Sequence, residues 1–191
     1  APYIDNTATN PGGDAADTVD SIGTGGSGTE RGLQKAYTAL EYFQITGKFI
    51  RNSSTLIMIF VSDEPDHSQL NYIDYVHGYL NFKAQEEIRV YGVIGDPLSG
   101  CSASFGQFSM NAQFGAGYYE VINYFGGSWY SICQYDWASS MYNLATDITT
   151  QSSFLLEESD PIVDTIEVYI NGQQTTTGWS YDPIDNLVRF E

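Results

Sequence analysis

Residues 23–33 read GTGGSGTERGL, a glycine-rich run that opens onto a helix and could hold a phosphate, hold a metal ion or simply turn the chain. A phosphate loop of the form GxxxxGK followed by Ser or Thr needs a lysine, and this run has none. A dinucleotide fingerprint needs a strand directly before its glycines, but the residues before Gly23 show no strand pattern. Phosphate and dinucleotide binding are therefore set aside.

A plain structural role explains part of the run. Ser27 and Glu30 have the spacing of a capping box, in which each side chain bonds the backbone N–H of the other residue. The box does not account for Thr29, whose hydroxyl sits at the predicted helix start and can bond a neighbouring carbonyl or face a ligand.

The apolar run LIMIFV, residues 56–61, ends in a polar loop that can supply a partner for Thr29. Ligands of open parallel sheets bind just outside the carboxyl ends of the strands. Threonine and aspartate offer hard oxygen donors suited to Mg²⁺ or Ca²⁺. Thr29 and Asp63 are therefore the predicted metal ligands. The predicted neighbours of this site are Ser27, Ser62 and Glu64.

No catalytic set can be assembled, so the chain is not expected to be an enzyme. His67 and His77 have no second histidine or cysteine at ligand spacing, which favours solvated or capping roles. Ser62 and Asp63 lack a GxSxG motif and a histidine placed by a motif.

The elements that must position these residues alternate between strands and helices. The unbroken apolar runs at 56–61 and 88–94 predict strands that are covered on both faces. Residues 129–133 are expected to form a third strand. Apolar residues at helical spacing predict helices before, between and after these strands: one starting near Thr29, one around 73–80, one within 115–127, and one over 136–151 capped by Asp136. This alternation predicts an α/β fold with a parallel sheet.

The pattern changes beyond residue 151 to short alternating runs with a turn at Asn171 and Gly172, which predicts a small antiparallel unit. Trp179 and Tyr181 of this unit could present their rings to a carbohydrate. The favoured alternative is that they pack inside the unit and form its small hydrophobic core (mini-core). The predicted organisation is an extended arm over 1–22, an α/β domain over 23–151 and a C-terminal β-hairpin module over 152–191.

The formal charge is −17, from 24 acidic and 7 basic side chains, so the chain repels nucleic acid. No stretch approaches the roughly 20 apolar residues of a membrane span. Cys101 and Cys133 are the only cysteines, and they are either free thiols of a cytosolic protein or one disulfide of an exported one. The acidity and the scarcity of basic residues favour the disulfide.

Four segments, TGGSGTERGL, LIMIFVSDE, VYGVIGD and YSICQYDWA, resemble in order the von Willebrand factor A (vWA) domain of exported bacterial proteins, over about residues 20–150. That family binds a metal ion through an Asp-x-Ser-x-Ser motif after its first strand, a Thr on a later loop and an Asp after its fourth strand. Thr29 and Asp63 match the last two. The Asp-x-Ser-x-Ser half is absent, and DNTAT at residues 5–9 is interpreted as part of the arm.

The resemblance implies a partial three-layer, Rossmann-like sandwich that holds strands four to six, with a small antiparallel β appendage. Strand four, residues 56–61, would then be an edge that an upstream part of the protein or another chain covers. The metal site would be incomplete, because Thr29 and Asp63 supply about two of the six ligands that Mg²⁺ takes.

The resemblance also implies that Cys101 and Cys133 form a disulfide and that the protein is secreted or lies on the cell surface. The expected function is an extracellular adhesion module that recognises a protein or glycan, with a divalent metal at the partial site. The alternative is a structural subunit or processed fragment of a larger surface assembly, such as a filament, sheath or virion, with a vestigial metal site.

Overall fold

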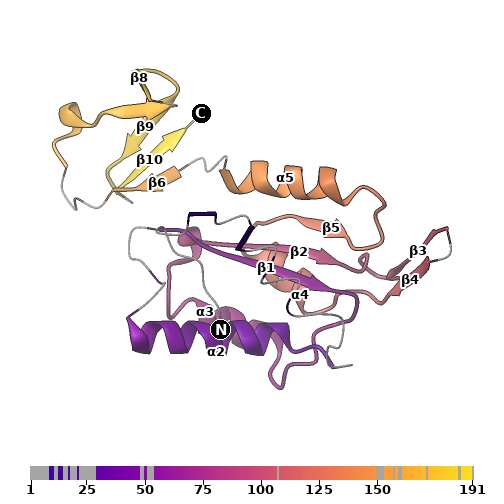
Figure 1. The fold of residues 1–191 in the computed structure, drawn as a ribbon. Coiled ribbons are helices and arrows are strands. Elements are labelled where there is room, and N and C mark those ends of the chain that lie inside the picture. The colour runs from indigo at the N-terminus through magenta and orange to yellow at the C-terminus, as the bar shows by residue number, and fades with distance from the viewer. Residues whose placement is uncertain are drawn as a thin grey trace.

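The computed structural model describes residues 9–10, 13–14, 17, 21, 29–47, 50, 54–106, 108–149, 153–156, 158, 161–170, 172–184 and 186–190. The predicted arm lies almost entirely outside these residues. The chain forms, in order (Figure 1), α2 (Gly32–Thr46), β1 (Leu56–Ser62), α3 (Tyr72–Tyr79), the 3₁₀ turn η1 (Gln85–Glu87), β2 (Ile88–Ile94), β3 (Cys101–Phe105), β4 (Phe108–Ala112), α4 (Tyr118–Tyr124), β5 (Trp129–Ser131), α5 (Trp137–Thr149), β6 (Ser153–Leu155), η2 (Val163–Thr165), β7 (Val168–Ile170), β8 (Gln173–Thr175), β9 (Trp179–Asp182) and β10 (Leu187–Phe190).

A parallel sheet in the order β1-β2-β5 organises the first part of the chain. β1 and β2 pair along their whole length, from Leu56 opposite Ile88 to Ser62 opposite Ile94, and β5 pairs with the end of β2. Figure 1 shows α2, α3 and α4 on one face of the sheet and α5 on the other. The predicted α/β fold with a parallel sheet is confirmed.

The main core lies between the sheet and the helices α2, α3 and α4, where the predicted apolar faces meet. Its fully buried members come from both helices and strands: Leu33, Val76, Tyr79, Ile88, Val90, Ile94, Val121 and Ile122. Gly127 lets the turn after α4 approach β2 closely, because a Cβ there would lie 1.8 Å from the carbonyl oxygen of Val90.

β1 corrects the expectation that both apolar strands are covered on both faces. β2 is buried on both, but β1 alternates, with Met58 and Phe60 buried and Ile59 and Val61 47% and 60% exposed. The reason is the position of α5, which packs through Trp137 and Met141 on the smaller cluster around Val93 of β2. No described element covers that face of β1 at Ile59 and Val61.

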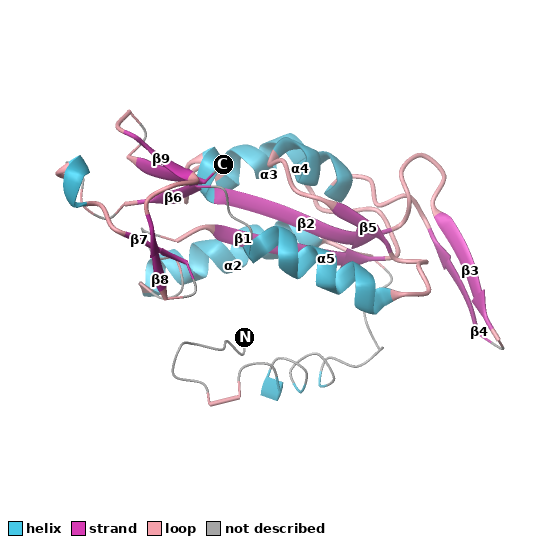
Figure 2. Ribbon diagram, turned by 90° about the horizontal axis from the view of Figure 1, so that it is seen from above, coloured by secondary structure: helices cyan, strands magenta, loops and turns pink. Residues whose placement is uncertain are grey.

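The β3–β4 hairpin was not predicted, and Figures 1 and 2 show it projecting from one end of the sheet. The predicted antiparallel unit beyond residue 151 is confirmed as two small sheets, β6-β10-β9 and β7-β8. Within it the Trp179 Nε1 donates to the Thr175 carbonyl at 3.1 Å, and the Tyr181 hydroxyl donates to Asn186 at 2.8 Å. Both aromatic side chains are half-buried, which favours the mini-core over a carbohydrate platform.

Candidate functional site

The start of α2 lies at the rim of the sheet, the edge at the carboxyl end of β1, where side chains of other segments bond to it. Its N-cap, Arg31, makes no side-chain capping bond. Instead the N–H of Gly32 donates to the Tyr118 hydroxyl at 3.0 Å, that of Leu33 to Asp66 at 3.2 Å, and that of Gln34 to Ser68 at 3.0 Å. Because the first N–H groups of a helix lack partners within it, side chains from distant segments cap α2.

The predicted capping box is therefore wrong for Glu30, since that residue precedes the helix and α2 begins only at Gly32. Ser27, the other half of the box, lies outside the described residues. The loop after β1 caps the start of α2 through Asp66 and Ser68.

Asp66 is the centre of this arrangement. Its carboxylate also accepts from the Ser68 N–H at 3.1 Å and the Ser68 hydroxyl at 2.9 Å, and its own N–H donates to the Ala116 carbonyl at 2.8 Å. The N–H of the next residue, His67, donates to the Glu30 carbonyl at 2.6 Å. Asp66 and its neighbours thus join the loop after β1, the start of α2 and the segment before α4.

The predicted metal ligands lie on the two loops that this network joins. Thr29 and Asp63 are both exposed, and Thr29 is adjacent to Glu30, which accepts from His67. The carbonyl of Asp63 accepts from the Gln113 N–H at 2.8 Å. The structure brings the two loops together, but the carboxylate that bonds the helix start is that of Asp66, which sequence reasoning did not single out.

Of the predicted neighbours, Ser62 is buried, and its hydroxyl donates to the carbonyl of Glu64 at 2.8 Å and accepts from that residue's N–H at 3.2 Å. These two bonds close a tight turn directly after β1. Ser62 thus has a structural role at the rim, and Glu64 is half-buried.

Two buried tyrosines near the start of α2, Tyr79 and Tyr118, have raised side-chain pKa values. The Tyr79 hydroxyl donates to the Leu33 carbonyl at 2.8 Å, and burial together with the nearby Asp66 charge raises the pKa of Tyr79 far above its usual value. Burial raises the pKa of Tyr118 to about 12, against the opposing effect of the Gly32 N–H. Both phenols are therefore neutral at ordinary pH and act as hydrogen-bonding groups.

The rim does not by itself complete a metal site. Across the described segments, no group of three or more His, Cys, Asp or Glu side chains could hold a metal ion. Asp66, the best-placed carboxylate, already accepts from Leu33 and Ser68. Thr29 and Asp63 are two oxygen donors, fewer than the six or more of a typical Mg²⁺ or Ca²⁺ site.

The predicted disulfide is confirmed. Cys101, at the start of β3, is bonded to Cys133, two residues after β5, with their Cα atoms 6.0 Å apart. It fixes the base of the projecting hairpin to the edge strand of the sheet. Among the described helices, none has the length and apolar character needed to cross a membrane.

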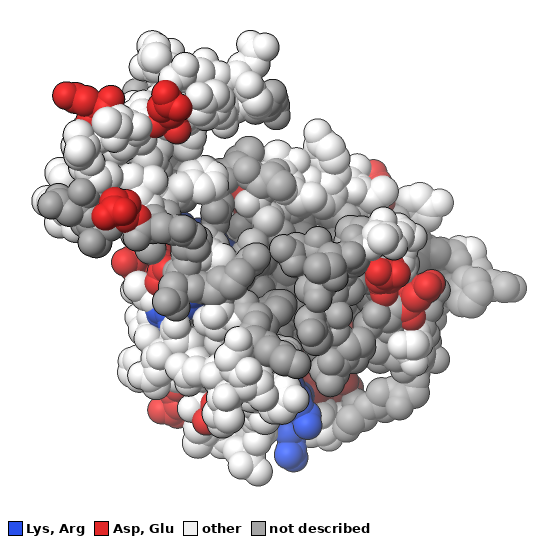
Figure 3. All heavy atoms as spheres, turned by 60° about the vertical axis from the view of Figure 1, so that its left-hand side comes forward, with Lys and Arg blue, Asp and Glu red and all other residues white. Residues whose placement is uncertain are grey.

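Acidic side chains are scattered over the face of the molecule shown in Figure 3. On that face, Asp and Glu lie in several separate places and few Lys or Arg are visible. Comparisons of the chain with models of known protein families, with curated proteins and with solved structures found no match.

Proposed function

We propose that this chain is a non-catalytic, extracellular binding or adhesion module that recognises a protein or glycan at the rim beyond β1. The observation that carries the proposal is the hydrogen bond from the His67 N–H to the Glu30 carbonyl. A second bond, from the Leu33 N–H to the Asp66 carboxylate, joins the same two segments. It holds the loops of the exposed residues Thr29 and Asp63 in a fixed relation, and preorganisation of this kind lowers the entropic cost of binding a ligand. The disulfide supports export, because such bonds persist in oxidising compartments.

The fold proposed for this module is the later part of a vWA-like sandwich, strands four to six. The adjacency of β1, β2 and β5 in chain order agrees with it. In this proposal an upstream part of the protein, or another chain, covers the edge of the sheet at β1, beside the exposed Ile59 and Val61.

Mg²⁺ or Ca²⁺ is the proposed cofactor, with Thr29 and Asp63 as the ligands that this chain contributes. A bound cation would supply an open coordination position for a carboxylate or other oxygen of the partner. The remaining ligands would come from water, from the partner or from the chain that covers β1.

Calorimetric titration with Mg²⁺ and Mn²⁺ tests this proposal. We expect the protein to bind the cation and the Asp63→Ala variant to lose that binding. Asp164→Ala is the matched control, since Asp164 is an exposed carboxylate of the C-terminal module. Equal affinity in all three proteins, or binding by none, would end the metal proposal.

The open face of β1 favours one alternative, a structural subunit or processed fragment of a larger surface assembly such as a filament, sheath or virion, with a vestigial metal site. Ile59 and Val61 would then be buried between subunits. Purification from the native source would show repeated copies in contact through β1, and the adhesion proposal instead expects a separate ligand.

A further inference from the structure

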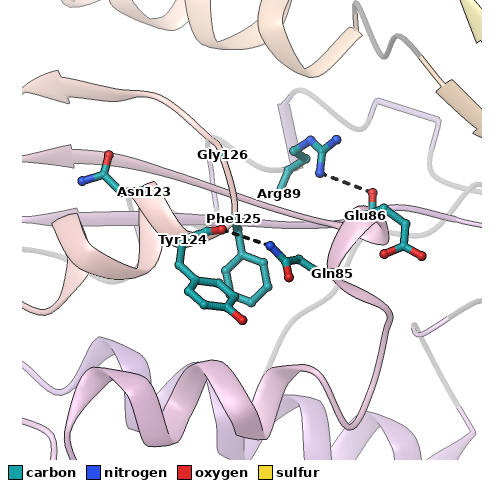
Figure 4. A pocket seen from close by; sticks show the side chains of 7 residues that line it. All are labelled: Gln85, Glu86, Arg89, Asn123, Tyr124, Phe125 and Gly126. Atoms are coloured by element: carbon teal, nitrogen blue, oxygen red, sulfur yellow. Dashed lines mark hydrogen bonds between the residues drawn. The ribbon is translucent and has the colours of Figure 1, made fainter.

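A groove of about 400 Å³ lies between η1, the start of β2 and the end of α4 (Figure 4). Its walls carry Gln85, Glu86 and Arg89 on one side and Asn123, Tyr124 and Gly126 on the other. Because η1 precedes β2 whereas Asp63 follows β1, and the two strands are parallel, the groove and the rim lie at opposite ends of the sheet. Its volume is within the roughly 300–1,000 Å³ of small-molecule sites.

Two polar side chains of the groove, Arg89 and Gln85, are held in place by backbone carbonyls. The Arg89 Nη1 donates to the carbonyls of Ile88 at 2.9 Å and Glu86 at 3.3 Å. The Gln85 amide donates across the groove to the Tyr124 carbonyl at 3.4 Å, as Figure 4 shows. The Nη1 nitrogen thus holds the Arg89 guanidinium in place. The other N–H groups of this guanidinium have no hydrogen-bond acceptor among the described residues.

One wall offers a fixed aromatic ring. Tyr124 is 36% exposed, and its ring packs edge-on against buried Phe125, with centroids 5.1 Å apart and planes at 71°. Gly126 has a φ of 67°, and no atom lies within 4 Å of the position that a Cβ would occupy. The space next to the backbone of Gly126 is therefore open.

The composition of the lining selects a class of ligand. Arg89 and Glu86 cancel in formal charge, and the amides of Gln85 and Asn123 can each donate and accept. A multiply charged anion would meet the field of a chain with net charge −17. We propose that the groove binds a neutral saccharide of one or two sugar units, with its hydroxyls on Arg89 and the amides and a C–H face on Tyr124. This site needs no cation and goes beyond the function proposed for the rim.

The experiment uses glucose, galactose, mannose, N-acetylglucosamine and maltose, at up to about 50 mM, which detects millimolar complexes. Saturation-transfer difference and ¹⁵N-correlation NMR are recorded on the whole chain in EDTA. We expect at least one sugar to bind and to shift the amides of Arg89 and Gly126. Binding should weaken about fivefold or more in Tyr124→Ala and in Arg89→Met, as for anchor residues of an interface, and should survive in Tyr124→Phe.

Tyr142→Ala is the matched control, because Tyr142 is an exposed tyrosine of α5 outside the groove. This variant should bind the sugar with the same affinity as the unmodified protein. The proposal is overturned if none of the sugars binds, if binding shifts amides elsewhere, if both groove variants bind normally, or if sodium sulfate displaces the sugar. Tyr124→Phe separates loss of the site from loss of the fold. Because the buffer holds EDTA, failure of the metal proposal leaves this test unaffected.

Discussion

Asp66 illustrates how one carboxylate can hold together segments that are far apart in the sequence. It accepts from Leu33 of α2 and from Ser68 of its own loop, and the same three-segment junction contains the Tyr118 hydroxyl. The sequence showed Asp66 only as one acidic residue of a polar loop. Its role depends on where α2 begins, and that position was predicted three residues too early because Glu30 suited a local cap.

Replacing Asp66 with alanine should lower the free energy of unfolding by about 2–3 kcal/mol, because backbone donors at Leu33 and Ser68 lose a charged acceptor. Urea denaturation followed by circular dichroism measures the change. Asp164→Ala, an exposed carboxylate, should stay within about 0.5 kcal/mol of the unmodified protein. Similar values for both variants would contradict the role assigned to Asp66.

Alkaline pH should destabilise the protein through its buried phenols. Burial raises the pKa of Tyr118 from 10.0 to about 12, and the pKa of Tyr79 is also raised. Since the folded state disfavours tyrosinate, this contribution to stability is complete below the unfolded value near 10 and is lost as pH rises through 12.

Urea unfolding at several pH values, with tyrosinate absorbance recorded in parallel, tests this expectation. The free energy of unfolding should decline between pH 10 and about 12, and the decline should be shallower in Tyr118→Phe. Tyr142→Phe changes an exposed tyrosine and should leave the slope unaltered. Identical slopes in both variants would mean that the pKa of Tyr118 is the same in the folded and unfolded states, contrary to the shift described here.

At the scale of elements, β1 and β2 show what an apolar run can and cannot predict. Both runs were recognised as strands, and the bounds of β2 were predicted as they are observed. The extent of coverage was not predictable, because it depends on whether a helix lies over the strand, and α5 packs on β2 instead of β1. The β3–β4 hairpin was missed although CSASF and FSMNA each alternate apolar with polar residues, a strand pattern that was overlooked.

The two faces of β1 should respond differently to truncation. Phe60→Ala removes a buried ring that packs against Tyr118 at 5.1 Å, and it should cost about 3–5 kcal/mol of unfolding free energy. Val61→Ala, on the next residue and the open face, should change it by only about 0.5 kcal/mol. Chemical denaturation of both variants measures this contrast. A large cost at Val61 would show that this face is covered in solution.

At the scale of the whole molecule, the Cys101–Cys133 bond encloses the hairpin, α4 and β5, a sequence separation of 32 residues. Its location was inferred from two cysteines and a resemblance, whereas the hairpin that it anchors was not predicted. Removing both thiols, Cys101→Ser with Cys133→Ser, should cost about 3 kcal/mol, mainly through the larger freedom of the unfolded chain.

Thermal unfolding with and without reductant tests the disulfide prediction. Reductant should lower the melting temperature of the unmodified protein and leave the double variant unchanged, so that the variant controls for other effects of the reagent. Equal melting temperatures for the oxidised protein and the double variant would contradict a stabilising bond.

The exposed edge of the sheet at β1 affects how the purified protein should associate in solution. A strand edge flanked by exposed Ile59 and Val61 can template pairing between molecules, and the charge of −17 keeps those molecules apart. Ionic strength weakens that mutual repulsion without weakening backbone pairing. Light scattering during a sodium chloride titration should therefore record self-association that rises with salt, and Val61→Lys should suppress it.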